Sequence, residues 1–216
     1  NRGLVLSGLG RHQEALESYD RALATRPGDP KVLVNRGSAL AQLRQYWEAI
    51  ESYDRALGLD SSDPLAFNNR GIAYRNRGMV DRAIEDFGEA IKIDANYAVA
   101  YYNRGTVYYD KADQDRAITD FDAALKLNPT YVAALHDRGV AHYDKHDYDR
   151  AIADQTTALK IDPKTPRAYH HRGAAWSNKG EPDRALADFD AALAQTPDNP
   201  QILHARGIEH AVKANY

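Results

Sequence analysis

The sequence predicts an all-α solenoid of stacked helix-turn-helix units, because it repeats with a fixed step and each repeat carries two amphipathic segments. Glycine recurs every 34 residues: Gly3, Gly37, Gly71, Gly105, Gly139, Gly173 and Gly207. Two alanine columns, which begin at Ala15 and Ala22, keep the same step. A fixed period of about 20–50 residues indicates units that stack on their neighbours to bury a continuous core.

The repeats follow one another without insertion or deletion, so we expect a single array over residues 1–216, with about six repeats and a terminal helix. Its parts are a partial repeat at 1–29, complete repeats at 30–63, 64–97, 98–131, 132–165 and 166–199, and a partial repeat at 200–216. Because the chain opens and stops partway through a repeat, we expect it to be part of a longer protein. The incomplete ends also favour end-to-end association between chains.

The repeat at 98–131 shows why each period should hold two helices. In its first segment Tyr101, Gly105 and Tyr108 are spaced four and three apart, which places them on one helix face. Residues 112–114 are expected to form a short turn. The second segment carries an apolar stripe: Ala117, Ile118, Phe121, Ala124, Leu125 and Leu127. It should end at Asn128, because the following Pro129 disfavours helix in the residue before it.

The periodic glycine predicts a close seam between the two helices of a repeat. We expect each glycine to face an alanine of the second helix, since small residues permit axes near the lower end of about 8–10 Å. An aromatic column is expected to fill the wider part of the seam: Tyr19, Tyr53, Phe87, Phe121 and Phe189. Gln155 interrupts this column, and the sequence gives no reason for it.

These columns resemble the tetratricopeptide repeat (TPR) family over essentially the whole chain. The family pattern is matched in the 98–131 repeat by Tyr101, Gly105, Tyr108, Ala117, Phe121, Ala124 and Pro129. The resemblance implies a right-handed α-solenoid whose first helices line a concave groove that binds protein partners. The pentatricopeptide RNA binders are a less fitting alternative, because their usual step is one residue longer.

The chain departs from the family pattern at the residue before each periodic glycine. Leucine is common there in the family, but this chain has arginine in every copy, from Arg2 to Arg206. A buried guanidinium needs a partner, and one column of second-helix carboxylates could supply it: Asp86, Asp120, Asp154 and Asp188. We expect structural ion pairs, with a role in ligand binding as the alternative.

Polar residues at the groove positions predict where a partner binds. By resemblance the groove carries Asn35, Asn69 and Asn103, whose amides can both donate to and accept from a peptide backbone. A second set is expected to contact peptide side chains: Asn68, Arg75, Tyr102, Tyr109, His136, His170 and His171. The histidines could make binding depend on pH between about 5.5 and 7. Alternatively, the asparagines are simply solvated surface.

Composition and motifs narrow the functional classes. The chain has 43% hydrophobic and 27% charged residues, a net charge of −3 and no cysteine. With no basic stripe and no long apolar run, we expect neither nucleic acid nor a membrane as partner. Phosphate-binding glycine loops and hydrolase or metalloprotease motifs are missing from the sequence, so we expect no enzymatic activity and no cofactor. The compartment stays open, with the cytoplasm favoured.

The sequence therefore predicts a protein–protein interaction scaffold that binds an extended peptide segment. Two alternatives remain. The array could be a regulatory or substrate-recruiting arm of a larger enzyme, or its histidine-rich end could hold a metal or small molecule. For the metal reading, His142 and His146 are four residues apart, a spacing that can place two imidazoles on one helix face.

Overall fold

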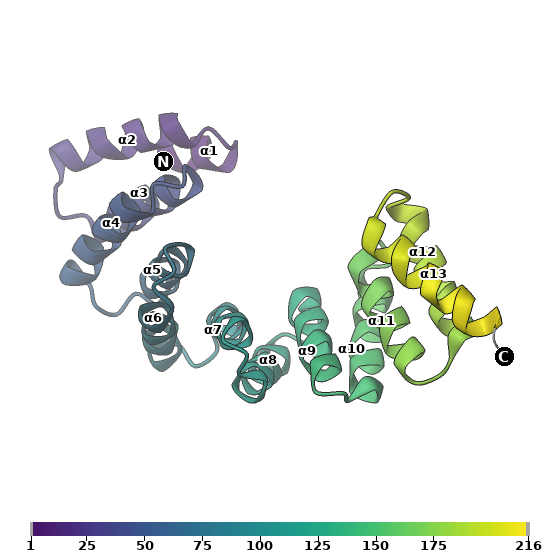
Figure 1. Cartoon of the computed structure of the whole chain (residues 1–216). Helices are drawn as coiled ribbons and strands as arrows, with labels where there is room; N and C mark the ends of the chain where they lie inside the picture. The colour runs from purple at the N-terminus through teal and green to yellow at the C-terminus, as the bar shows by residue number, and fades with distance from the viewer. Residues whose placement is uncertain (1, 215–216) are drawn as a thin grey trace. The chain divides into compact units, whose positions relative to one another are not determined.

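The computed structural model describes residues 2–214, and the regular secondary structure of this part of the chain is all α-helical, with thirteen α-helices and no strand (Figure 1). It confirms the all-α repeat fold. Two compact units are present, Asn1–Val107 and Tyr108–Tyr216. The single array over 1–216 stays a prediction.

Two helices per period are observed in both units, as the repeat pattern predicts. The first unit contains α1 (Arg2–Gly8), α2 (His12–Thr25), α3 (Pro30–Gln42), α4 (Tyr46–Leu59), α5 (Pro64–Asn76), α6 (Val80–Ile93) and most of α7 (Ala98–Asp110). The second contains the end of α7, α8 (Gln114–Leu127), α9 (Val132–Asp144), α10 (Tyr148–Ile161), α11 (Pro166–Asn178), α12 (Pro182–Gln195) and α13 (Pro200–Ala214). Helix α8 ends just before Asn128–Pro129, as expected. Within the described residues, no helix is long and apolar enough to cross a bilayer.

Several first helices begin at proline, whose fixed φ and missing N–H suit the first helical position. Asp29 precedes Pro30 and accepts a hydrogen bond from the Val32 backbone N–H at 3.2 Å. Asp63 precedes Pro64 and accepts from the Leu65 N–H at 2.9 Å. These caps satisfy N–H groups that have no partner inside the helix, so local sequence fixes where α3 and α5 start.

The turn inside each repeat contains one residue with a left-handed backbone, again with a step of 34. These residues are Gly10, Arg44, Gly78, Ala112, His146 and Gly180, with φ between 59° and 75°. The N–H that follows reaches back to a carbonyl of the last helical turn, as from Gln45 to Leu40 at 2.9 Å. This geometry ends the first helix. Glycine tolerates it without strain, whereas the three other side chains do not.

The left-handed turn rules out the alternative in which His142 and His146 share a helix face. Helix α9 ends at Asp144, and His146 lies in the turn with φ of 61°. Its Nδ1 is 2.9 Å from the Tyr148 hydroxyl. His142 is buried in the core of its repeat, and this burial lowers its pKa. The two imidazoles therefore do not form a helical metal-binding pair.

The periodic glycines mainly face the column of Tyr19, Tyr53, Phe87 and Phe189, so the Gly–Ala seam is wrong as the general contact. Gly173 also has a residue of the alanine column nearby, with the Ala185 carbonyl oxygen 3.2 Å from an added Cβ. A Cβ added to Gly37 would lie 2.6 Å from Tyr53 Cε1, and one added to Gly71 would lie 2.8 Å from Phe87 Cε1. The flat ring of the second helix lies directly over the glycine backbone. Gly207 has nothing within 4 Å of such a Cβ, because no second helix follows α13 in the described residues.

The expected arginine–aspartate pairs are confirmed in both units. Arg70 Nη2 is 2.7 Å from Asp86 Oδ1, and Arg138 and Arg172 pair in the same way with Asp154 and Asp188. The interpretation missed a second acid, which comes from the second helix of the preceding repeat. Its members include Asp20, Asp54, Asp122 and Asp190, paired with Arg36, Arg70, Arg138 and Arg206. At these four positions the ion pair ties a repeat to the one before it, whereas Arg172 donates instead to Thr156 Oγ1 at 3.2 Å.

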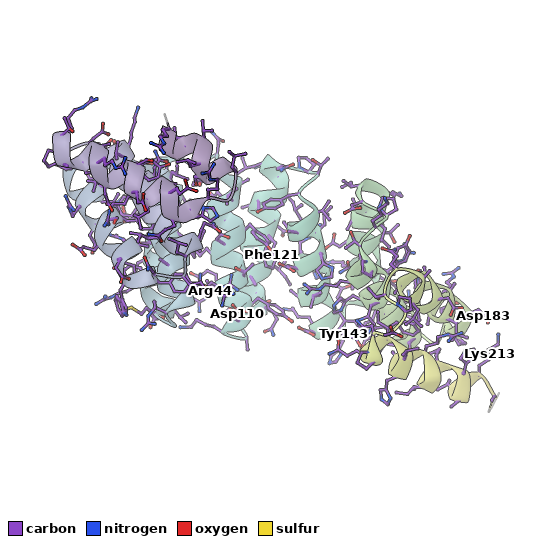
Figure 2. All side chains as sticks on the ribbon, turned by 90° about the horizontal axis from the view of Figure 1, so that it is seen from above. Arg44, Asp110, Phe121, Tyr143, Asp183 and Lys213 are labelled. Atoms are coloured by element: carbon purple, nitrogen blue, oxygen red, sulfur yellow. The ribbon has the colours of Figure 1, made fainter. Side chains whose placement is uncertain are left out.

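A further ion-pair column in the second unit joins a lysine in the last turn of a first helix, or just after that helix, to an aspartate at the start of the previous second helix. The pairs are Lys145 with Asp115, Lys179 with Asp149 and Lys213 with Asp183. Figure 2 shows the last pair, between α13 and α12. All three acids are highly exposed on their side chains, at 79% or more, so each pair adds little stability.

Candidate peptide-binding faces

The first unit holds a row of hydrogen-bonded side chains on its first helices, which we call the amide strip: Ser38, Asn69, Asn68, Asn103 and Thr106. Asn69 Nδ2 donates to Ser38 Oγ at 3.3 Å, linking α5 to α3. Asn103 Nδ2 donates to Asn68 Oδ1 at 2.8 Å, linking α7 to α5. Asn68 Nδ2 donates to Asn69 Oδ1 at 3.3 Å, and this bond connects the other two into one row. Two of the three asparagines expected to hold a backbone are therefore brought together.

Asn68 does not have the role that the sequence suggested. It is only 2% exposed, and its amide is held between Asn69 and Asn103. A side chain so enclosed cannot contact a side chain of a peptide on the surface. Its position indicates that it orients the two half-buried asparagines instead, as a buried amide must be hydrogen-bonded to be tolerated.

Asn103 keeps hydrogen-bonding capacity after its bond to Asn68. A primary amide carries two N–H groups and an oxygen with two lone pairs. Within residues 2–214, the structure shows one N–H of Asn103 in use and no hydrogen bond accepted by its Oδ1. Asn103 can therefore offer one donor and one acceptor to a peptide bond.

The other first-unit residues lie around the strip or away from it. Arg75 is exposed and donates from Nη1 to Thr106 Oγ1 at 3.0 Å, which places it at the end of the strip. Tyr102 is half-buried on α7. Asn35 does not join the strip: it lines a separate hollow of about 370 Å³ with Lys31, at the side of α3 that meets α1 and α2. Ser38 and Thr106 were not anticipated, and no feature of their columns marks them.

The second unit contains a pocket of about 520 Å³, which we call the histidine pocket. It is lined by His136, Asp137 and Val140 of α9, by Pro166, Arg167, His170 and His171 of α11, and by Thr196, Asn199, Gln201 and Ile202 around the start of α13. The ring centroids of His136 and His171 are 5.1 Å apart, and those of His170 and His171 are 5.3 Å apart. Three predicted residues thus meet in one place.

Protonation of His171 in this pocket requires a lower pH than the sequence suggested. Burial lowers the pKa of His171 to about 4, and the positive charge that His136, His170 or Arg167 can carry lowers it further. Burial also lowers the pKa of His170. For His171, the expected titration between about pH 5.5 and 7 is therefore wrong, because an imidazole held away from water stays neutral there.

Gln155, the break in the aromatic column, is explained by His136. Its side chain is fully buried. Gln155 Nε2 donates to the His136 backbone carbonyl at 3.0 Å, and Gln155 Oε1 lies 3.0 Å from His136 Nδ1. The histidine alone does not predict the glutamine, because the equivalent His170 of the next repeat lies against Phe189, with ring centroids 6.1 Å apart.

Tyr109 is not part of the histidine pocket. Its hydroxyl donates to Asp144 Oδ2 at 2.6 Å, between α7 and α9. Burial raises its pKa, and the hydrogen bond to Asp144 acts in the same direction. Among the described residues, no group of three or more potential metal-binding side chains comes together, the histidine pocket included.

Comparisons with known families decide the identity of these repeats. Tetratricopeptide repeat family models match residues 1–64, 98–131 and 139–207, and a TPR repeat model matches residues 73–112. The chain is a tetratricopeptide repeat protein. Proteins of this family are generally protein–protein interaction scaffolds and are typically non-enzymatic. Among curated proteins, none matches this chain.

Solved TPR structures share its fold. YrrB, described as a TPR protein with an unusual peptide-binding site, is 24% identical, with a TM-score of 0.74 over 89% of this chain and 99% of its own. MamA is 26% identical, with a TM-score of 0.70 over 77% and 91% of the two chains. PilF of Pseudomonas aeruginosa is 18% identical, with a TM-score of 0.85 over 95% and 93%. At 24% and 18% identity, YrrB and PilF support the fold alone.

Proposed function

We propose that this TPR protein binds an extended segment of a protein partner along its first helices, with Asn69 and Asn103 holding the backbone. The observation that carries the proposal is the amide strip. Buried Asn68 fixes both neighbouring amides, while Asn103 retains a donor and an acceptor. A binding site works best when its polar groups are already oriented, because less freedom is lost on binding.

The spacing of the asparagines fits an extended peptide. They recur once per repeat, at Asn35, Asn69 and Asn103. Packed neighbouring helices lie about 10 Å apart, and an extended chain advances about 3.4 Å per residue. One asparagine would therefore meet every third peptide bond or so. Binding to the backbone at this interval gives affinity without dictating each side chain, and the histidine pocket can add selectivity.

The test uses the whole chain and peptides of about twelve residues selected from a random display library, a length that extends over about 40 Å. The triple variant Asn35→Ala, Asn69→Ala, Asn103→Ala removes all three asparagines that recur once per repeat. Because Asn35 lies outside the amide strip, the loss is expected from Asn69 and Asn103; two hydrogen bonds worth about 0.5–1.5 kcal/mol each predict that Kd rises by about fivefold to a hundredfold.

The matched control carries Glu51→Ala and Glu85→Ala, two exposed positions on second helices, and should bind as the unaltered chain does. Circular dichroism must show that the triple variant is folded, because loss of Asn103 leaves buried Asn68 without its donor. Equal Kd values for the triple variant and the unaltered chain would contradict the proposal, and so would failure to select any peptide.

A further inference from the structure

Gln155 fixes the proton of His136. The His136 backbone carbonyl can only accept, so the Gln155 group 3.0 Å from it is the Nε2 donor. The other end of the amide, Oε1, then lies 3.0 Å from His136 Nδ1 and can only accept. Nδ1 must therefore carry the hydrogen. In a neutral imidazole this leaves Nε2 as a bare acceptor.

The burial of Gln155 indicates that this arrangement has a use beyond packing. The equivalent residues in other repeats are Phe87, Phe121 and Phe189, all essentially inaccessible to solvent. A buried amide gives less stability than a buried ring, even when it is hydrogen-bonded. Glutamine at this position stabilises one orientation and one tautomer of His136, a half-buried residue that lines the histidine pocket.

The pocket's side chains do not select an occupant of either charge, because Asp137 and Arg167, of opposite charge, both line it. A carboxylate or phosphate would meet the lone pair of His136 Nε2 and the Asp137 side chain. An ammonium or guanidinium would meet Arg167. His171 supplies no compensating charge, since burial keeps it neutral at pH 7. The acceptor on His136 Nε2 instead favours a neutral group that can donate a hydrogen bond.

The size and lining of the pocket favour an aromatic side chain as the carrier of that hydrogen-bond donor. A volume of about 520 Å³ is large enough for a tyrosine or tryptophan side chain with water. Val140, Pro166 and Ile202 provide apolar surface, and the rings of His170 and His171 provide edges and faces for an aromatic partner.

We infer that the histidine pocket takes a tyrosine or tryptophan side chain of the bound segment, whose O–H or N–H donates to Nε2 of His136, and that Gln155 is the positioning residue. The inference rests on the proposed function, since the side chain arrives as part of a peptide. A site built to hydrogen-bond a ligand discriminates against the analogue that lacks the donor. Replacing the tyrosine or tryptophan by phenylalanine should therefore raise Kd by about tenfold.

Two measurements test the inference. Long-range ¹H–¹⁵N NMR of the whole chain at pH 7 to 8 reports the tautomer of His136 without any ligand. We expect hydrogen on Nδ1, and hydrogen on Nε2 would overturn the inference. Peptides selected on the unaltered chain are then resynthesised in pairs that differ only by tyrosine or tryptophan against phenylalanine, and each pair is compared by calorimetry.

The variant Gln155→Phe restores the aromatic of the other repeats. It should bind both members of a pair equally, with the Kd that the unaltered chain shows for the phenylalanine peptide. If it does not fold, the double variant His136→Leu, Gln155→Phe replaces both hydrogen-bonding partners by apolar groups and should behave in the same way. Gln42→Ala, at an exposed position of α3, is the control and should keep the tenfold preference.

The outcomes separate the two proposals. Peptides that bind without preferring tyrosine or tryptophan, or that place acidic or basic residues at this position, overturn the inference and leave the proposed function standing. A preference lost in Gln155→Phe but kept, at weaker affinity, in the triple asparagine variant supports both. A preference that survives in Gln155→Phe overturns the role of Gln155.

Discussion

The periodic glycines allow one substitution to be tested with opposite expected signs at two equivalent positions. In Gly37→Ala, the new Cβ would lie 2.6 Å from Tyr53 Cε1, although ordinary contacts start at 3.4 Å. The ring must therefore move by about 0.8 Å, the difference between these distances. Tyr53 is 1% exposed, and its hydroxyl donates to Ser38 at 3.3 Å, so it has little room. Overpacking of this kind costs about 1–3 kcal/mol.

Inside a helix, alanine is about 1 kcal/mol more stable than glycine. This gain offsets part of the overpacking cost, so the unfolding free energy of Gly37→Ala should be lower by up to about 2 kcal/mol. Gly207→Ala makes the same substitution in α13, where no atom lies within 4 Å of the new methyl group. It should gain about 0.5–1 kcal/mol from helix propensity alone.

Urea unfolding followed by circular dichroism measures both variants. A double-mutant cycle of Gly37→Ala with Tyr53→Leu tests whether the Tyr53 ring causes the loss. It should show a favourable coupling, because leucine has no atom at the position of Cε1. The reasoning is refuted if Gly37→Ala stabilises the chain as much as Gly207→Ala does, or if the cycle shows no coupling.

Three further predictions concern the ion pairs, the buried histidine and the turns. Asp86→Ala should lose about 3 kcal/mol of unfolding free energy in urea, because it leaves Nε and Nη2 of the mostly buried Arg70 without their acceptor, a carboxylate only 7% exposed. Asp54→Ala, at 51% exposed, should lose less than about 1 kcal/mol, and equal losses would contradict this. The pKa of His171 is about 4 in the folded chain, compared with 6.5 for an exposed ring. As the pH falls below 6.5, the unfolded chain therefore binds the proton first, and the free energy of unfolding decreases until about pH 4. The unaltered chain should therefore lose about 2 kcal/mol more than His171→Asn between pH 7.5 and about 4.5, and parallel stability–pH curves would show that His171 is not held neutral. Ala112→Gly relieves a left-handed φ of 59° and should raise the melting temperature, equivalent to about 0.5–1 kcal/mol; a decrease would mean that the turn is not strained.

The sequence by itself determined the repeat architecture. A step of 34 residues with helical periodicity inside each repeat sets the number, type and order of the helices, because local spacing decides which face of a helix is apolar. It also determined the pairing of the periodic arginines with Asp86, Asp154 and Asp188, since a guanidinium at an apolar position must find a carboxylate within reach.

Only the tertiary structure decided how side chains meet between helices. That the glycines lie under aromatic rings, that Asn68 is buried and that Gln155 orients His136 all depend on the direction of each side chain after packing. Spacing places a residue on a helix face, but it does not say which neighbouring helix covers that face or how deeply. The lowered pKa of His171 has the same origin, because it is set by the neighbours that exclude water from the ring and not by the ring itself.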